Sequence, residues 1–255
     1  MTRFEIVGRT GKAHLSAGTL AQEDHVNAGQ MQAAGRVVLV ASPKGGVGKS
    51  SIARNLLVSA AYAKLRVFGL DFDRQETLAK WHARRERVRR SFPEAIEVPV
   101  VAAPIGEWRA ALEDKSRYDL VVIDTPPVIE DAYTAALSLC AASDHVLVPT
   151  GATQDDIDSV VPWMRTLRSN DIRASFVLNK VNPRVKSFGT ARNKLLQVGS
   201  LCPIEVPTLE DIHVSAGKGL AVLDMGKGKP TEIFEGVWTY VARELGFTTA
   251  EGAVP

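Results

Sequence analysis

Short apolar runs recur along the chain from Arg36 onward, separated by longer segments of mixed polarity. Several runs are continuous rather than alternating, which is typical of strands buried on both faces of a parallel sheet. They are Val37–Ala41, Val67–Leu70, Val98–Ala102, Leu120–Ile123, Val146–Val148 and Ala174–Leu178. The segments between them predict helices over residues 50–64, 74–90, 107–115, 130–142 and 154–170. This alternation predicts an α/β domain with a doubly wound, mostly parallel sheet flanked by helices.

The last part of the chain predicts one further helix, over residues 231–245. Its apolar side chains recur at intervals of three and four residues, which places them on one helix face. They are Ile233, Phe234, Val237, Trp238, Val241 and Leu245. Thr231 is expected to cap the first turn of this helix, and Gly246 to end it.

The pattern changes at residue 36, which suggests a domain boundary. Residues 1–35 are rich in Gly, Ala, Gln and His and show little periodicity, so we predict a flexible N-terminal arm. A short edge strand over residues 3–7 is the alternative. We expect residues 36–246 to form the folded domain and residues 247–255 a short tail.

Composition excludes several classes of protein. With 255 residues, 45% hydrophobic and 24% charged, the chain is an ordinary globular protein rather than a disordered, collagenous or disulfide-rich one. The net charge of +2 does not by itself indicate nucleic-acid binding. Cys140 and Cys202 form no CxxC pair, so no zinc site is predicted. There is no apolar run of membrane-spanning length and no apolar signal segment, and we therefore expect a cytoplasmic protein without membrane association.

A glycine-rich loop is the most informative local motif. The segment Ser42–Ser50 reads SPKGGVGKS and lies between a predicted strand and a predicted helix. Glycines let backbone N–H groups surround a polyphosphate, and the start of a helix attracts anions. Lys49 would bridge the β- and γ-phosphates, and the Ser50 hydroxyl would bind Mg²⁺. The residues expected to contact nucleotide here are Gly45, Gly46, Val47, Gly48, Lys49, Ser50 and Ser51.

Carboxylates follow two of the predicted strands. Asp71 and Asp73 end one strand, and Asp124 ends another. A single aspartate in such a place is often only a helix cap. Beside a phosphate-binding loop, however, carboxylates at the ends of neighbouring strands favour a Mg²⁺ site for phosphoryl transfer.

Three segments together resemble the ParA/MinD family of deviant-Walker P-loop ATPases. They are Lys44–Ser50, Asp71–Gln75 and Val121–Pro127. The resemblance covers about residues 36–245. It implies the P-loop NTPase fold, ATP and Mg²⁺ as cofactors, and slow ATP hydrolysis to ADP and phosphate that a partner protein stimulates.

The resemblance also implies roles for single residues. Lys44 would contact the nucleotide in the partner subunit of an ATP-dependent homodimer, and Asp73 would position the attacking water. The implied catalytic residues are therefore Lys44, Lys49 and Asp73. The implied metal ligands, partly acting through water, are Ser50, Asp71 and Asp124. The residues implied to lie near the adenine are Asn179, Lys180, Pro207, Thr208 and Glu210.

Two positions depart from the family pattern. Pro43 stands where the family loop carries a glycine, and Arg74 replaces a proline that often follows the second aspartate. Arg74 leaves the backbone less restricted but keeps the Asp73 carboxylate. The residues before Arg36 are too few for the helix-turn-helix domain of longer ParA proteins. The chain thus resembles the compact ParA type.

Basic residues gather in three places. One cluster lies on the predicted helix over residues 74–90: Lys80, Arg84, Arg85, Arg87, Arg89 and Arg90. It is interpreted either as a solvated helix face or as a partner surface. The second cluster contains Arg184, Lys186, Arg192 and Lys194, and Arg192 matches an arginine that ParA proteins use for nonspecific DNA. The third contains Lys218, Lys227 and Lys229. Glu210 and Asp211 argue against a full match to the DNA-binding members.

The leading hypothesis is a ParA-like ATPase that dimerises on ATP and binds double-stranded DNA nonspecifically. The residues expected to contact DNA are Arg184, Lys186, Arg192, Lys194 and Lys218. Such a protein would be nucleoid-associated. It would position a plasmid, a chromosome region or a protein assembly with a ParB-like or cargo adaptor protein. The alternatives are a MinD-like membrane-associated ATPase and a small-molecule synthetase or reductase of the same superfamily.

Overall fold

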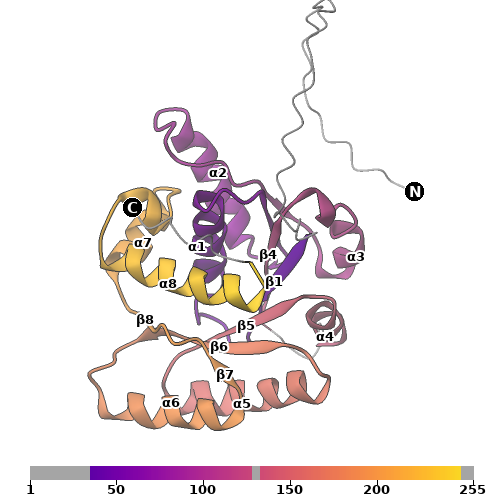
Figure 1. Ribbon diagram of the computed structural model, residues 1–255, viewed down its shortest axis with the longest axis vertical. Coiled ribbons are helices and arrows are strands. Elements are labelled where there is room, and N and C mark those ends of the chain that lie inside the picture. Colours follow the sequence, from indigo (N-terminus) through magenta and orange to yellow (C-terminus); the bar gives the residue numbers. More distant parts are fainter. Residues whose placement is uncertain (1–34, 128–132, 248–255) are drawn as a thin grey trace, which may run out of the picture. The chain divides into compact units, whose positions relative to one another are not determined.

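The computed structural model describes residues 35–127 and 133–247. Within them, eight strands form one sheet in which every pair is parallel, with the order β3-β2-β4-β1-β5-β6-β7 and β8 paired with β6 (Figure 1). The strands are β1 Arg36–Val40, β2 Val67–Asp71, β3 Val100–Ala102, β4 Leu120–Asp124, β5 His145–Thr150, β6 Ala174–Val181, β7 Ser200–Leu201 and β8 Val206–Pro207. The predicted fold class is confirmed.

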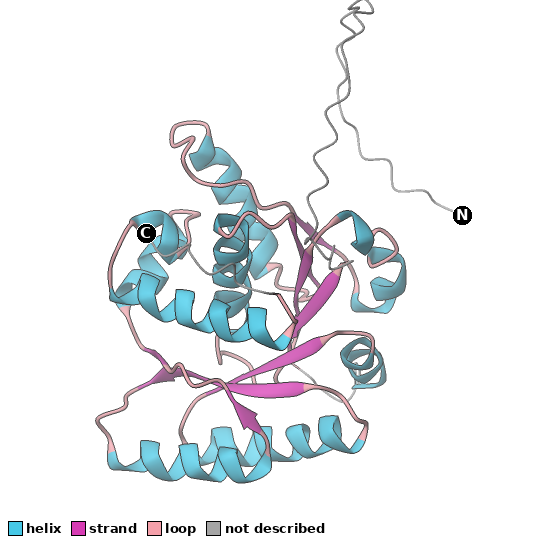
Figure 2. Ribbon diagram, in the orientation of Figure 1, coloured by secondary structure: helices cyan, strands magenta, loops and turns pink. Residues whose placement is uncertain are grey.

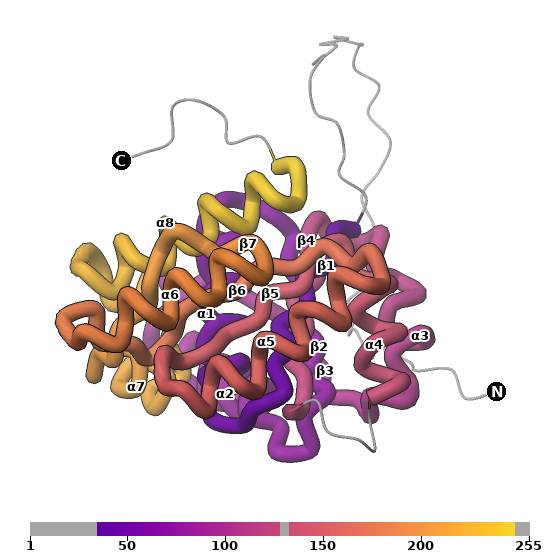
Figure 3. The backbone as a smooth tube through the Cα atoms, turned by 90° about the horizontal axis from the view of Figure 1, so that it is seen from below, coloured from indigo at the N-terminus to yellow at the C-terminus, as the bar shows by residue number. Residues whose placement is uncertain are grey.

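Helices cover both faces of this sheet (Figures 1 and 2). They are α1 Lys49–Tyr62, α2 Thr77–Arg89, α3 Trp108–Ala111, α4 Tyr133–Ala141, α5 Gln154–Ser169, α6 Lys186–Val198, α7 Glu210–Gly217 and α8 Lys229–Glu244. One core packs α1, α2, α7 and α8 against the sheet, and the other packs α3 to α6. On the second face, α5 and α6 run side by side (Figure 3).

The central strand β1 shows how the sequence pattern produces these two layers. Val38 and Val40 belong to the core under α1, whereas Val37 and Leu39 belong to the core under α5. All four side chains are fully buried. Successive side chains of a strand point to opposite faces, so only a continuous apolar run can serve two helical layers.

Several predicted boundaries differ from the structure. The expected helix over residues 107–115 contains only the single turn α3, with short 3₁₀ turns at Ile105–Glu107 and Lys115–Arg117 on either side. The helices α6 and α7 were not predicted. The arm 1–34, the tail from residue 248 and residues 128–132 of a predicted helix lie outside the described residues, so the domain boundaries stay a prediction.

The predicted cap of the last helix was wrong. Helix α8 begins at Lys229, after Gly228, with Pro230 in its first turn. Proline suits this position because its fixed φ is already helical and it has no N–H to satisfy. Thr231 is buried inside the helix, and its hydroxyl is 3.2 Å from the Val222 carbonyl and 2.7 Å from the Gly226 carbonyl. The predicted stop is confirmed, since Gly246 adopts a φ of 77°.

The basic helix was also only partly a surface feature. Arg85 on α2 is fully buried and forms an ion pair with Asp224, which is 2.6 Å away. Trp81 on the same helix donates its indole N–H to the Leu220 carbonyl. The solvated-face interpretation is therefore wrong for Arg85, because this side chain anchors α2 to the segment before α8.

Within the described residues, no helix combines the length and the apolar character needed to cross a bilayer.

His145 makes the stability of this fold dependent on pH. It begins β5, is nearly fully buried, and its Nε2 lies 2.7 Å from Ser175 Oγ. Burial, followed by nearby Arg173, lowers the pKa of His145 from 6.5 to about 4. Glu244 lies 3.8 Å from the other ring nitrogen. Because the unfolded chain binds the proton more readily, the free energy of unfolding contributed by His145 is complete above pH 6.5 and is lost toward pH 4.

Urea denaturation at pH 7 and at pH 5 measures this dependence. The His145→Gln variant is expected to lose a part of it, since glutamine does not titrate. The same pH dependence in the variant as in the unaltered protein would show that other groups cause it.

Candidate nucleotide-binding site

The glycine-rich loop connects the carboxyl end of β1 to α1. Gly46 and Gly48 have φ values of 75° and 90°, in the left-handed region that favours glycine. Gly48 is also restricted by space, because a Cβ there would lie 2.2 Å from Asn179 Nδ2. Within the described residues, no side chain caps α1 and no acidic residue occupies its first turn. The backbone N–H groups in the first turn of α1 are therefore free to bind an anion held by the loop.

Lys49 places a buried positive charge at the start of α1, beside the glycine-rich loop. Its side chain is the first of α1, and its Nζ lies 3.3 Å from the Lys44 carbonyl oxygen. Burial lowers the pKa of Lys49, while the charges of Asp124 and Asp73 oppose this shift. The lysine thus belongs to a group of opposite charges at the carboxyl edge of the sheet.

Asp124 ends β4, whose register pairs it with both Val40 of β1 and Asp71 of β2. Its side chain is fully buried, and neither carboxylate oxygen has a hydrogen-bond partner within residues 35–127 and 133–247. Burial raises the pKa of Asp124 to about 7, although neighbouring Ser50 and Lys49 lower it. A buried carboxylate without a donor is costly unless a cation or an ordered water engages it.

This arrangement fits a magnesium ion that keeps most of its water. Ser50 and Asp124 supply a hydroxyl and a carboxylate, both oxygen ligands of the kind Mg²⁺ prefers. Among the described residues, no three His, Cys, Asp or Glu side chains gather closely enough to hold a metal by themselves. Phosphate oxygens and water would complete the shell of a Mg²⁺ ion here.

Asp71 has partners of its own. One carboxylate oxygen accepts the backbone N–H of Asp73 at 3.0 Å, and the other accepts those of Leu78 and Ala79, each at 2.9 Å. Asp71 therefore caps α2 from the neighbouring strand and ties down the loop that carries Asp73. The metal role implied for Asp71 stays a prediction.

Lys44 contacts its own chain. Its Nζ lies 2.5 Å from Asp156 Oδ1 on α5, and this hydrogen bond raises the pKa of Lys44. Asp156 is held in turn by Thr153 in a capping box at the start of α5. Sequence analysis missed Asp156, although the Thr-x-x-Asp spacing was visible there. The contact of Lys44 with a partner subunit stays a prediction.

The expected adenine-side residues lie against the loop. Asn179 Nδ2 donates to the Val47 carbonyl and Lys180 Nζ to the Gly46 carbonyl, both at 2.7 Å. Strand β8 pairs with β6 at Asn179 and ends at Pro207, so Thr208 follows on the same edge, where its N–H is 3.3 Å from the Val181 carbonyl. Glu210 begins α7 and is exposed.

Two further side chains connect α1 to this region, and sequence analysis missed both. Arg54 donates to the Ile212 carbonyl of α7, and Asn55 accepts the Val222 N–H. No local pattern indicates these contacts, since their partners lie more than 150 residues away.

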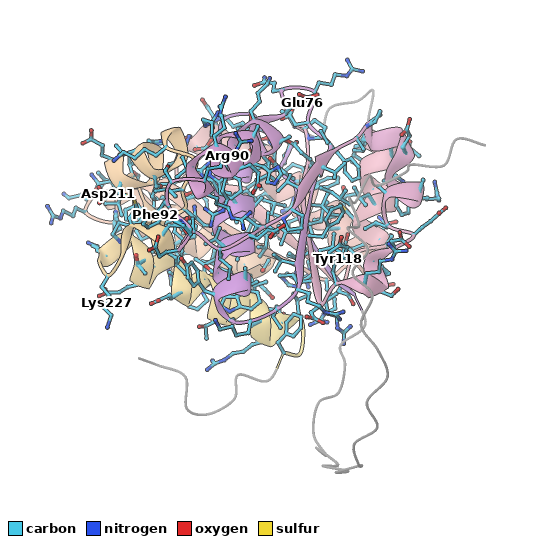
Figure 4. The ribbon with its side chains drawn as sticks, turned by 90° about the horizontal axis from the view of Figure 1, so that it is seen from above. Glu76, Arg90, Phe92, Tyr118, Asp211 and Lys227 are labelled. Atoms are coloured by element: carbon cyan, nitrogen blue, oxygen red, sulfur yellow. The ribbon has the colours of Figure 1, made fainter. Side chains whose placement is uncertain are left out.

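The expected DNA-contacting residues lie in two separate places. Arg184 and Lys186 are exposed at the start of α6, whereas Arg192 pairs with Glu205 at 3.4 Å and Lys194 donates to Gln154. Lys218 directly follows α7, on the opposite face of the sheet from α6. On that C-terminal part, drawn in pale gold, the side chains of Asp211 and Lys227 also project outward (Figure 4).

Comparison with known proteins also indicates a nucleotide-binding domain, in agreement with the glycine-rich loop and the carboxylates at the strand ends. Residues 38–222 match the family described as the CobQ/CobB/MinD/ParA nucleotide binding domain. The chain is 30% identical to the maintenance of carboxysome distribution protein A (McdA) of Gloeobacter kilaueensis over 213 residues, or 82% of this chain and 94% of that protein.

Two solved structures show the same fold at low sequence identity. The septum site-determining protein MinD of Pyrococcus horikoshii, in complex with Mg-ADP, is 16% identical and covers 83% of this chain and 97% of its own, with a TM-score of 0.64. A Cyanothece McdA variant in complex with ATP is 14% identical and covers 84% and 98%, also with a TM-score of 0.64. The sheet and its flanking helices are thus shared with both.

Proposed function

Because the chain belongs to the CobQ/CobB/MinD/ParA nucleotide-binding family, we propose that it is a ParA-like ATPase that positions a cargo. In this proposal it binds ATP with Mg²⁺, dimerises on ATP, and hydrolyses ATP slowly until a partner protein stimulates it. The observation that carries the proposal is the fully buried Asp124 carboxylate, which lies beside Ser50 and Lys49 at the start of α1 and meets no donor at hydrogen-bond distance among the described residues.

Each residue of the site has a distinct task in this proposal. The loop N–H groups and Lys49 bind the phosphates, while Ser50 and Asp124 hold the metal. Bound Mg²⁺ would neutralise charge on the phosphate oxygens. Asp73, whose backbone is tied to Asp71, accepts a hydrogen bond from the attacking water and orients it. Lys44 leaves Asp156 and contacts the nucleotide of the partner subunit.

The cargo is proposed from the relatives, and the DNA surface along which it would be positioned is proposed from surface charge. The Gloeobacter relative is named for carboxysome distribution, which supports a large protein assembly as cargo, with a plasmid or a chromosome region as the alternatives. A ParB-like or cargo adaptor protein would stimulate hydrolysis. Arg184, Lys186, Arg192, Lys194 and Lys218 would bind double-stranded DNA nonspecifically, and a dimer would present two copies of each. The protein would then associate with the nucleoid.

Phosphate release and binding to a random DNA fragment test this function together. DNA binding is measured with ATP, with ADP and without nucleotide, at about 50 and 200 mM salt. If six to ten phosphates are contacted, affinity is expected to fall by about 10³–10⁵-fold between these salt concentrations. The Arg192→Ala variant should bind DNA more weakly, whereas Arg117→Ala, in the 3₁₀ turn before the central strand β4, should not.

The Asp73→Asn variant separates ATP hydrolysis from ATP-dependent dimerisation and DNA binding. Hydrolysis is expected to fall by about 10²–10⁴-fold, the usual contribution of a positioned base, while ATP-dependent dimerisation and DNA binding persist. Hydrolysis without DNA binding in any nucleotide state would favour a protein that binds a membrane or another protein instead of DNA. Absence of both ATP binding and hydrolysis in the unaltered protein would overturn the proposed function.

A further inference from the structure

Lys180 has a backbone conformation that residues other than glycine rarely adopt. Its φ of 56° lies in the left-handed region, at the place where the register between β6 and β8 shifts, between Asn179 and Val181. A left-handed residue at a bulge is usually glycine, because a Cβ is strained there. Strain of this kind persists where the surrounding structure enforces it, and it is frequent at functional sites.

The strained backbone directs this side chain to the phosphate loop. Lys180 Nζ donates to the Gly46 carbonyl and Asn179 Nδ2 donates to the Val47 carbonyl, each at 2.7 Å. Two consecutive residues of β6 thus hold two consecutive carbonyl groups of the loop. Both donors come from a strand that is more than 130 residues further along the chain.

Peptide geometry gives these two contacts a direction. In a planar trans peptide the carbonyl of one residue and the N–H of the next point in opposite directions. When Lys180 holds the Gly46 carbonyl, the Val47 N–H points away from β6. When Asn179 holds the Val47 carbonyl, the Gly48 N–H does the same. The two side chains therefore turn two amide donors toward the space that a phosphate would fill.

Stability does not account for a lysine at this position. The Lys180 side chain and its hydrogen bond are exposed to solvent, where such contacts contribute little. Glycine at the same place would avoid the backbone strain. The hydrogen bond to the loop is what a lysine supplies here and a glycine does not.

We propose that Lys180 is a positioning residue of the phosphate loop, which holds the Gly46 carbonyl so that the loop N–H groups bind the phosphates of a nucleoside triphosphate. This inference rests on the proposed function, since it assigns Lys180 to the same nucleotide site. It places Lys180 at the phosphates, whereas the family resemblance implied a place near the adenine.

The chain offers a matched control for this proposal. Lys64 is a second exposed lysine with a left-handed φ, of 68°, and it lies beyond the opposite end of α1. Lys180→Gly and Lys64→Gly both remove backbone strain, so each is expected to raise Tm by about 2–4 °C. Affinity for Mg-ATP, measured by titration calorimetry, should fall about tenfold only in Lys180→Gly, as expected when one loop N–H no longer makes its charge-assisted hydrogen bond to a phosphate.

A second variant excludes an effect of added backbone freedom. Lys180→Asn keeps a side chain that tolerates the left-handed region but removes the ammonium group, and it should weaken Mg-ATP binding as much as Lys180→Gly does. Wild-type affinity in both Lys180 variants, or equal weakening in Lys64→Gly, would overturn the inference while the proposed function stands. If the unaltered protein bound no nucleotide, the proposed function itself would fail.

Discussion

Lys49→Ala is expected to reduce ATP hydrolysis by about 10²–10³-fold, the usual cost of removing one charge-stabilising group from a transition state. The side chain of Lys49 is buried at the start of α1, close to Asp124 and Asp73, and burial lowers its pKa. A buried ammonium group there has no carboxylate partner closer than 4 Å within the described residues. Phosphate would supply that partner. Steady-state phosphate release with Mg-ATP measures the effect.

Two further variants make this measurement specific. Lys49→Arg keeps the charge but replaces the compact ammonium group by a larger planar one, so it should also lose activity. Lys64→Ala, beyond the other end of α1, should hydrolyse ATP at the wild-type rate. Wild-type hydrolysis by Lys49→Ala would show that the glycine-rich loop is not the phosphate site.

Arg85→Ala is expected to lower the free energy of unfolding by about 3–5 kcal/mol, as is usual when one partner of a buried ion pair is removed. Arg85 and Asp224 are both fully buried at the side chain, with 2.6 Å between Nη1 and Oδ2. The guanidinium also donates to the Ile96 carbonyl at 2.8 and 3.0 Å. The substitution removes the side-chain donors of this carbonyl and the buried counter-charge of the Asp224 carboxylate, which keeps only the Ala221 N–H and the Tyr62 hydroxyl as donors. Urea denaturation monitored by tryptophan fluorescence measures the loss.

Arg87→Ala is the control for this prediction. Arg87 lies on the same helix but is exposed, so the free energy of unfolding should change by no more than about 0.5 kcal/mol. The double variant Arg85→Met with Asp224→Leu replaces the pair by apolar side chains and should recover most of the loss. A loss below about 1 kcal/mol in Arg85→Ala alone would mean that the pair does not hold α2 in place.

The same pair changes the meaning of the basic helix. Six positive residues gather between Lys80 and Arg90 in the sequence. In the structure, Arg85 forms a buried ion pair with Asp224, and Arg89 contacts Glu86 and Glu97. Arg87 and Arg90 are the members that remain exposed together with Lys80. A count of charges along a helix therefore overstates the charge that a partner can meet.

Local patterns in the sequence determined the fold class and the centre of the site. Continuous apolar runs can be buried only between two helical layers, and β1 shows this with its alternate side chains. The glycine-rich loop was recognisable because positive φ at Gly46 and Gly48 is a local requirement. Asp71 and Asp124 could be expected to meet because the carboxyl ends of parallel strands share one edge, and the register pairs them directly.

Tertiary structure alone decided which partner each polar side chain found. Asn179 contacts the Val47 carbonyl, Lys44 contacts Asp156 on α5, and Arg85 meets Asp224, which lies 139 residues away. The left-handed backbone of Lys180 likewise depends on how β8 joins β6. Periodicity along a chain indicates which face of a helix or strand is buried, because the residues that form this face all belong to the same element. Pairing of polar groups from different elements depends on elements that meet only after the chain has folded, so no local pattern encodes it.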